Sequence, residues 1–195
     1  MTAFQEDSVD PKVTPIPLAE MDQEARDLIL RANLAREGEP LHVFGTIARH
    51  PKLFSVWLRF ANRLMISRNF DRRVTELVIL RVAYNMRNDY EWGQHTEISA
   101  EFGIGTEMLT RVMAGPQAEG WSPLEALLLQ ATDELHNERR ITSATWDELA
   151  KHLNEMQMME LCFLVGQYEM LAMFLQSAGV QLEAGKKGLP EHDNI

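Results

Sequence analysis

Cysteine is nearly absent from the sequence, since Cys162 is the only one among 195 residues. A single thiol cannot form an intramolecular disulfide bond, which argues against a disulfide-stabilised extracellular domain. Cys162 lies within the apolar run LCFLVG, a setting typical of an inert core residue. We therefore expect the protein to reside in a reducing compartment, the cytoplasm.

Long apolar runs are also missing. No stretch approaches the roughly 18 consecutive apolar residues that a membrane-spanning helix requires. Residues 1–10 carry acidic side chains and lack the basic and apolar pattern of a signal peptide. Together these absences predict a chain without a membrane partner.

Basic residues are outnumbered, with 19 Lys and Arg against 29 Asp and Glu, which gives a formal net charge of −10. Proteins that bind nucleic acid neutralise its phosphates with Lys and Arg, so we expect no nucleic-acid partner. An anionic lipid surface is disfavoured for the same reason. The apolar fraction of 45% and the charged fraction of 25% are ordinary for one folded domain of this length.

The two ends of the chain contain helix-breaking residues among polar ones. Three prolines between residues 11 and 17 predict an extended N-terminal arm over 1–20. Two glycines and a proline after residue 184 predict a flexible C-terminal tail over 184–195. The part between them, 21–183, contains repeated helix start and stop signals and almost no strand alternation, so we expect a single all-α domain.

The expected helices follow from apolar periodicity, capping residues and helix breakers. They span 20–37, 41–49, 52–67, 71–87, 89–102, 106–114, 122–137, a segment beginning at Ser143, and 156–180. The fourth helix is apolar nearly all round over 77–84, which predicts a central, buried position. The third helix has apolar residues at the spacing of one core-facing stripe: Leu53, Val56, Trp57, Phe60 and Leu64.

Polar side chains interrupt one apolar stripe. Glu91, His95, Ile98 and Phe102 are separated by four, three and four residues, which places them on one helical face. Glu91 and His95 lie roughly 5–6 Å apart at this spacing, within reach of a carboxylate–imidazole hydrogen bond. A neighbouring carboxylate favours the imidazolium, whereas burial favours the neutral ring, so His95 is either a positioned acid or a base. A structural ion pair explains the same spacing.

Glu76 is the next candidate, because Ile79 and Leu80 on the same helical face predict that it points inward. Arg72 and Arg73 precede it by four and three residues, so a simple ion pair at the start of the helix is the alternative. Other features favour structural roles. Tyr168 on an apolar helix is typical of a buried, locally satisfied hydroxyl. The methionines of the last helix indicate core packing or subunit contact: Met156, Met158, Met159, Met170 and Met173.

Four segments together resemble the carboxymuconolactone decarboxylase family. They are HPKLFSVWLRFANRL, RRVTELVILRVAYNMRNDYEWGQHTEISAEFGI, WSPLEALLLQATDEL and VGQYEMLAMFLQSAGVQLE, and the resemblance covers about 40–183. It implies a multi-helix bundle of the alkylhydroperoxidase D-like type. It also implies a homo-oligomer that acts on a small molecule.

The redox branch of this family carries C-x-x-C-x-x-x-H, with a glutamate twelve residues before the first cysteine. Here Glu76 and His95 match the glutamate and the histidine, whereas Asn88 and Glu91 occupy the two cysteine positions. Reduction of peroxide by a dithiol needs an attacking thiolate and a resolving thiol, and these residues supply neither. The resemblance therefore does not extend to thiol peroxidase chemistry.

The branch without cysteines decarboxylates a carboxylated muconolactone. Similarity to it implies a cofactor-free lyase or isomerase acting by acid–base chemistry on a small carboxylate substrate from aromatic catabolism, with Glu76, Tyr90, Glu91 and His95 as catalytic residues and no bound metal. Two alternatives stay open. Glu76, Glu91 and His95 could instead be ligands of a metal-dependent enzyme. The protein could also be a non-catalytic, oligomeric small-molecule-binding relative.

Overall fold

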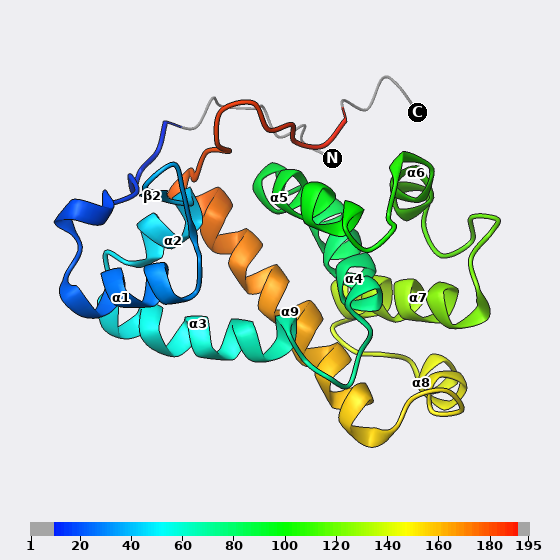
Figure 1. Ribbon diagram of the computed structural model, residues 1–195. Coiled ribbons are helices and arrows are strands. Elements are labelled where there is room, and N and C mark those ends of the chain that lie inside the picture. Colours follow the sequence, from blue (N-terminus) through cyan, green and yellow to red (C-terminus); the bar gives the residue numbers. More distant parts are fainter. Residues whose placement is uncertain (1–9, 191–195) are drawn as a thin grey trace.

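The computed structural model describes residues 10–190 and contains the helical bundle that the sequence predicts (Figure 1). The parts of the expected arm and tail at 1–9 and 191–195 lie outside the described residues. The elements in chain order are a 3-10 turn Leu18–Glu20, α1 Gln23–Arg31, β1 Ala35–Arg36, β2 Glu39–Pro40, α2 His42–Ile47, α3 Pro51–Met65, α4 Arg72–Asn85, α5 Asp89–Ala100, α6 Thr106–Ala114, α7 Pro123–Glu138, α8 Ser143–Leu149 and α9 Glu155–Ala178.

The first predicted helix is too long. It ends at Arg31, and the chain then forms a small antiparallel hairpin in which Ala35 pairs with Pro40. The cause is local backbone geometry, because Asn33 has a φ of 54° and Gly38 has a φ of 86°. These left-handed conformations end a helix and turn the chain, and Asn and Gly adopt them at low cost.

The prediction of a central fourth helix is confirmed. Every residue of α4 from Thr75 to Ala83 is buried, and the helix packs against α5, α6, α7 and α9. Asp71 caps its N-terminus by accepting a hydrogen bond from the backbone N–H of Arg73. In Figure 1 α4 lies at the centre of the bundle, with α5 above it and α9 and α7 on its two sides. The side chains of α4 therefore reach the core on all sides.

The long helix α9 joins two parts of the core. With α4 and α7 it forms one part, which includes Val78, Leu128 and Leu161, and with α1, α2 and α3 it forms the other, around Phe54 and Leu175. By length and composition alone α9 could cross a membrane. A helix in a protein core meets the same criterion, and 44% of its most apolar window is buried inside the bundle.

The predicted core stripe of α3 is wrong for three of its residues. Leu53, Val56 and Phe60 are 54%, 61% and 41% exposed, and the core receives Phe54 and Leu58 instead. The apolar residues of this helix cover a wide arc, so periodicity alone could not show which part of that arc α1 and α2 cover. The five methionines of α9, which we expected to pack in the core or at a subunit contact, also differ in exposure. Only Met158 is buried, and the other four are more than half exposed.

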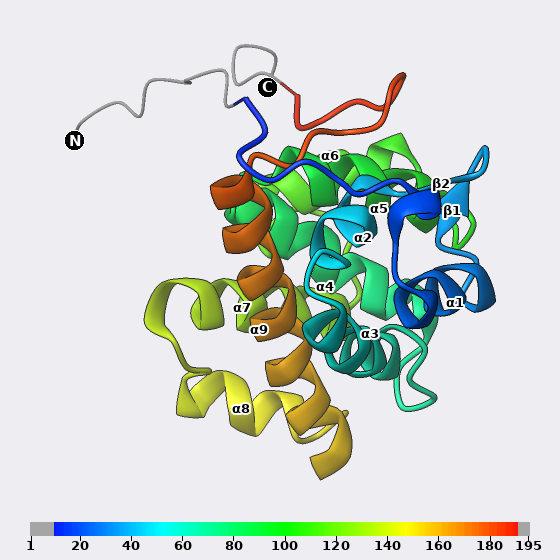
Figure 2. The same cartoon turned by 90° about the vertical axis from the view of Figure 1, so that its left-hand side faces the viewer.

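The chain after α9 folds back onto α5. Gly179 ends the helix in a left-handed conformation with a φ of 68°. Lys186 then pairs with Glu97, and the backbone N–H of Leu189 donates to Asp89. In both views this segment passes above α5 (Figures 1 and 2). The described part of the expected tail therefore contacts the bundle, and the domain boundaries themselves remain a prediction.

Close contact between this segment and α5 depends on Gly93. A Cβ atom there would lie 2.7 Å from the carbonyl oxygen of Lys187 and 2.8 Å from Leu182 Cδ2. In the intact chain we expect Gly93→Ala to lower the free energy of unfolding by about 1–3 kcal/mol through overpacking. In a chain truncated after Val180 the clash is gone, so the same change should raise it by about 0.5–1 kcal/mol, the preference of a helix for Ala over Gly. Urea denaturation of the four proteins measures both effects. The same sign in both backgrounds would contradict this account.

Candidate functional site

A cavity of about 210 Å³ lies where α2, α3, α5, α9 and the hairpin meet. Its walls are mainly apolar, with Phe44, Trp57 and Leu171 among the contributors. Its polar groups come from two helices: Tyr90, Glu91, Gln94 and His95 from α5, and Gln167 and Tyr168 from α9. An enclosed apolar space with a few converging polar groups is typical of a small-molecule site.

His95 is held by Glu76, which reaches it from α4. The distance between His95 Nδ1 and Glu76 Oε2 is 2.7 Å, and the Glu76 side chain is fully buried. The other oxygen of Glu76 forms an ion pair of 2.8 Å with Arg72, so the predicted ion pair at the helix start is confirmed. Because Nδ1 is engaged, Nε2 is the ring nitrogen of His95 that is left for a ligand in the cavity.

The expected hydrogen bond between Glu91 and His95 is not the one that forms. The packing of α4 against α5 brings Glu76 to Nδ1 of His95, and that nitrogen makes its hydrogen bond there. Glu91 is only 2% exposed, and neither of its carboxyl oxygens has a hydrogen-bond partner among the residues described. Burial without a partner raises the pKa of Glu91 well above its usual value of 4.5. The neutral acid, which can donate a proton, is therefore favoured.

Tyr90 is fixed by a residue of the C-terminal segment. Its hydroxyl donates to Glu183 Oε1 at 2.8 Å and accepts from the backbone N–H of Val43 at 3.1 Å. Gln94 donates to the other oxygen of Glu183, and the backbone N–H of His42 donates to Oε1 at 2.8 Å. Burial, and then the charge of Glu183, raise the pKa of Tyr90. Sequence reasoning missed Glu183, since nothing in the local pattern VQLEAG marks it.

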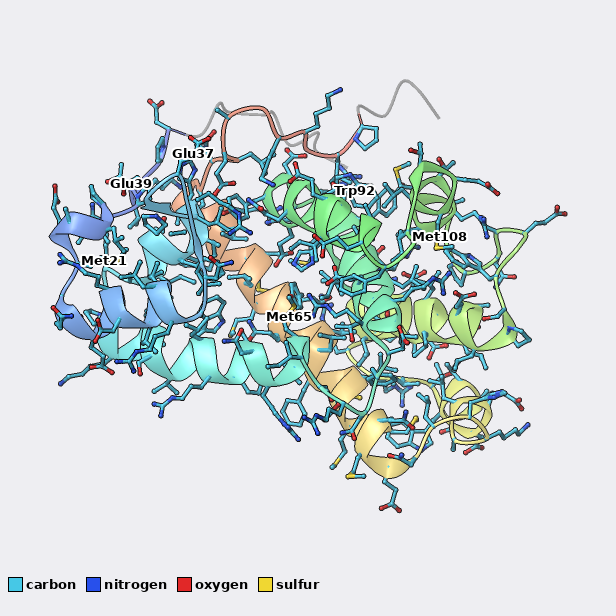
Figure 3. All side chains as sticks on the ribbon, viewed as in Figure 1. Met21, Glu37, Glu39, Met65, Trp92 and Met108 are labelled. Atoms are coloured by element: carbon cyan, nitrogen blue, oxygen red, sulfur yellow. The ribbon has the colours of Figure 1, made fainter. Side chains whose placement is uncertain are left out.

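Tyr168 also belongs to the site, although the sequence suggested only a structural role. Its ring meets the ring of His95 edge to face, with centroids 5.2 Å apart. Its hydroxyl is satisfied locally, as expected, by the sulfur of Met65 at 2.6 Å. Figure 3 shows Met65 near the end of α3, beside α9. Burial, followed by the charges of Glu76 and Glu91, raises the pKa of Tyr168.

A second unsatisfied group faces the same space. Gln167 lines the cavity with its side-chain oxygen buried, and no hydrogen-bond partner for that oxygen occurs within residues 10–190. Buried polar groups are rarely left without a partner, because the loss of hydration costs about 1–3 kcal/mol each. Glu91 and Gln167 are thus two polar groups that a bound ligand could satisfy.

The three proposed metal ligands do not converge. Among the residues that the structure describes, no group of three or more His, Cys, Asp or Glu side chains could hold a metal ion. Arg72 and His95 already engage both oxygens of Glu76, and Glu91 faces neither of these partners. The metal-dependent alternative therefore has no support in the geometry.

Asn88, at the first of the two motif cysteine positions, has a structural role, and Cys162 lies elsewhere, on α9. Asn88 caps α5 by accepting from the backbone N–H of Glu91 at 2.8 Å, and it donates to the carbonyl oxygen of Ala172. Cys162 is partly buried on α9 and does not line the cavity, and burial raises the pKa of its thiol. A raised thiol pKa is the opposite of what a reactive cysteine requires.

Comparison with known proteins shows which family the central helices resemble. Residues 51–134 match the carboxymuconolactone decarboxylase family, and this segment includes α3, α4 and α5. Over this segment the chain is similar to that family. No curated protein sequence matches it.

Solved structures with the same fold are distant in sequence. A variant of the debrominase Bmp8 in complex with 2,3,4-tribromopyrrole superposes with a TM-score of 0.76 at 14% identity, over 91% of this chain and 95% of that one. A peroxidase-related protein of Ralstonia eutropha JMP134, described as an alkylhydroperoxidase AhpD core, gives 0.77 at 15% identity, over 90% and 95%. A peroxidase-related protein of Silicibacter sp. TM1040 gives 0.76 at 14%, over 94% and 96%. These likenesses establish the fold alone.

The protonation state of Glu91 has a measurable effect on stability. The unfolded chain ionises Glu91 near a pKa of 4.5, whereas the folded protein keeps the proton to a higher pH. Between the two pKa values the folded state binds more protons, so the free energy of unfolding falls as pH rises, by at most about 1.4 kcal/mol per pH unit.

We expect Glu91→Gln to remove this loss. The variant should match the wild type below the unfolded pKa and become progressively more stable than it as pH rises towards neutrality. Urea denaturation of both proteins over this range measures the difference. A difference that does not change with pH would show that Glu91 is ionised in the folded protein.

Proposed function

We propose that this protein is a cofactor-free acid–base enzyme, a lyase or isomerase of the decarboxylase type acting on a small carboxylated ring. One observation carries the proposal. An unpartnered, buried Glu91 carboxyl lines the same apolar cavity as a histidine that Glu76 orients. Acid–base enzymes use pairs of titratable groups whose environments differ in this way.

His95 would contact the substrate through Nε2. Glu76 accepts the hydrogen bond of Nδ1 and so fixes the tautomer and the plane of the ring, while Arg72 holds Glu76 from its other side. The edge of the ring against Tyr168 further limits its rotation. In this arrangement His95 is a catalytic residue, and Glu76 and Arg72 are positioning residues.

Glu91 would supply a proton. When the bond between a ring carbon and its carboxylate breaks, CO₂ leaves and the electron pair passes into the conjugated lactone as an enolate. The neutral carboxyl of Glu91 then donates its proton to the ring carbon, and solvent returns a proton to Glu91 before the next cycle. The side-chain oxygen of Gln167 is available to accept a hydrogen bond from the substrate.

The walls of the cavity fit a small, largely apolar ligand with one anionic group. Its volume of about 210 Å³ is below the usual range for drug-sized ligands, which favours a single small ring. Arg36 on the hairpin is the one Lys or Arg in the lining within the described part of the chain, and it is exposed. It could attract a carboxylate at the rim, and the apolar interior would then remove water from the reacting group.

The first test follows the decarboxylation of γ-carboxymuconolactone by ultraviolet absorbance. We expect His95→Gln and Glu76→Gln each to lower kcat about 10²–10⁴-fold, the usual contribution of a positioned acid or base. His136→Gln is the matched control, because His136 and Glu169 form a similar pair of 2.8 Å outside this cavity. Equal losses in all three variants would indicate a general structural effect. Full activity in His95→Gln would remove the catalytic role of His95.

A folded wild type without turnover would favour the non-catalytic alternative. Thermal-shift measurements with small carboxylated lactones and with 2,3,4-tribromopyrrole would then test the cavity for binding alone. A shift that Glu91→Gln abolishes would place the ligand beside Glu91.

The rim residue separates binding from chemistry. Arg36 lies on the hairpin, and within residues 10–190 its hydrogen bonds are those to the carbonyl oxygens of Asn33 and Ala35. We expect Arg36→Gln to raise KM about tenfold with little change in kcat, because it removes an attraction that does not change during the reaction. Steady-state kinetics at low ionic strength measure this. A fall in kcat at unchanged KM would assign Arg36 to the chemical step.

A further inference from the structure

One buried amide in the wall of the cavity lacks a partner for its oxygen. Gln167 on α9 lines the cavity and is only 3% exposed, yet its side-chain oxygen has no hydrogen-bond partner within residues 10–190. The other two glutamines of this helix are engaged. Gln157 donates to the carbonyl oxygen of Asn69, and Gln176 donates to the two carbonyl groups just after α4. Gln167 is therefore the exception on its own helix.

The packing of α9 gives no reason for an amide at position 167. Its neighbours one turn away, Leu164 and Leu171, are apolar, and Leu171 and Leu175 line the same cavity. A leucine or methionine at this position would continue the apolar wall and leave no oxygen without a partner. Because a buried polar atom without a hydrogen bond is costly, the oxygen of Gln167 points to a ligand that supplies one.

The amide of Gln167 has no chemical step in the proposed reaction. Glu91 gives a proton and His95 contacts the substrate through Nε2, whereas an amide neither gains nor loses a proton at ordinary pH. Its contribution is a hydrogen bond at a fixed place in the cavity wall. Such a group recognises a substituent of the substrate without reacting with it.

The charges around the cavity indicate which substituent this is. Arg36 is exposed and is the one Lys or Arg in the lining among residues 10–190, while Glu76 adds a buried negative charge beside His95. A second anionic group of the ligand is therefore disfavoured against the buried oxygen of Gln167. A hydroxyl group is neutral, donates to an amide oxygen and also accepts from a carboxylic acid such as that of Glu91.

We propose that the substrate carries a ring hydroxyl group in addition to its carboxylate, and that this hydroxyl donates a hydrogen bond to Gln167 Oε1. Gln167 is then a specificity-determining residue. A site that is built to hydrogen-bond a hydroxyl group rejects the analogue without it, because the buried polar group is then left unpaired. This inference rests on the proposed function, since it names a feature of the same substrate in the same cavity.

Isothermal titration calorimetry with small carboxylated rings tests the inference. The probes are 3- and 4-hydroxybenzoate, each beside the methylbenzoate of the same substitution pattern, which has a similar size and no donor. We expect the wild type to bind at least one hydroxybenzoate about ten- to a hundredfold more tightly than its methyl counterpart. Gln167→Met should lose or reverse this preference. The variant should still fold, because an apolar side chain of similar length replaces an unpartnered polar one.

Gln176→Met is the matched control, because Gln176 lies on the same helix and outside the cavity lining. It should keep the hydroxyl preference of the wild type. Three results would each overturn the inference: equal affinity of the wild type for the paired probes, no binding of either hydroxybenzoate at millimolar concentration, or a preference that survives in Gln167→Met.

The kinetics of γ-carboxymuconolactone separate this inference from the proposed activity. This lactone has no hydroxyl group, so Gln167→Met should not raise its KM. A raised KM would assign Gln167 to another group of the substrate and overturn the inference. Turnover without a hydroxyl preference in the binding assay would overturn the inference alone. A hydroxyl preference without turnover would support the inference and count against the lyase.

Discussion

The carboxylate of Glu76 is buried inside the bundle, with Arg72 2.8 Å from one oxygen and His95 2.7 Å from the other. An uncompensated charge in such a place costs several kcal/mol, so the helices must pack in a register that brings both partners to it. This requirement ties α4 to α5. It sets the rotation of α5 about its axis, and with it the direction in which Glu91 enters the cavity.

The two buried glutamates of the site are stabilised in different ways. Glu76 has a guanidinium and an imidazole as partners, whereas Glu91 has apolar surroundings and no partner among the described residues. They come from neighbouring helices, yet their surroundings suit the opposite tasks that we propose for them: one orients a base and the other keeps a proton. A dithiol site needs neither arrangement, whereas the acid–base chemistry that we propose uses both.

Local periodicity was enough to predict the helical class, the buried centre of α4 and the inward direction of Glu76, Glu91 and His95, because each depends on neighbours within one helix. The partner of His95 could not be predicted, since it depends on how α4 packs against α5. The exposed side of α3 was misassigned because its apolar residues cover a wide arc of the helix, and the sequence does not show which part of that arc packs inward. Glu183 went unnoticed, and Tyr168 was assigned only a structural role, for a related reason: their contacts in the site are with residues far away in the sequence.

Glu183 accepts a hydrogen bond from the backbone of His42, which lies 141 residues earlier in the chain. Contacts between such distant residues carry a large loop-closure cost and tend to form after local helices have folded. The wall of the cavity formed by α2, α5 and the C-terminal segment is therefore expected to close late in folding. In the native protein, the amide proton of His42 becomes free to exchange with solvent when Glu183 releases it, so its exchange rate reports on opening of the cavity separately from unfolding of the helices.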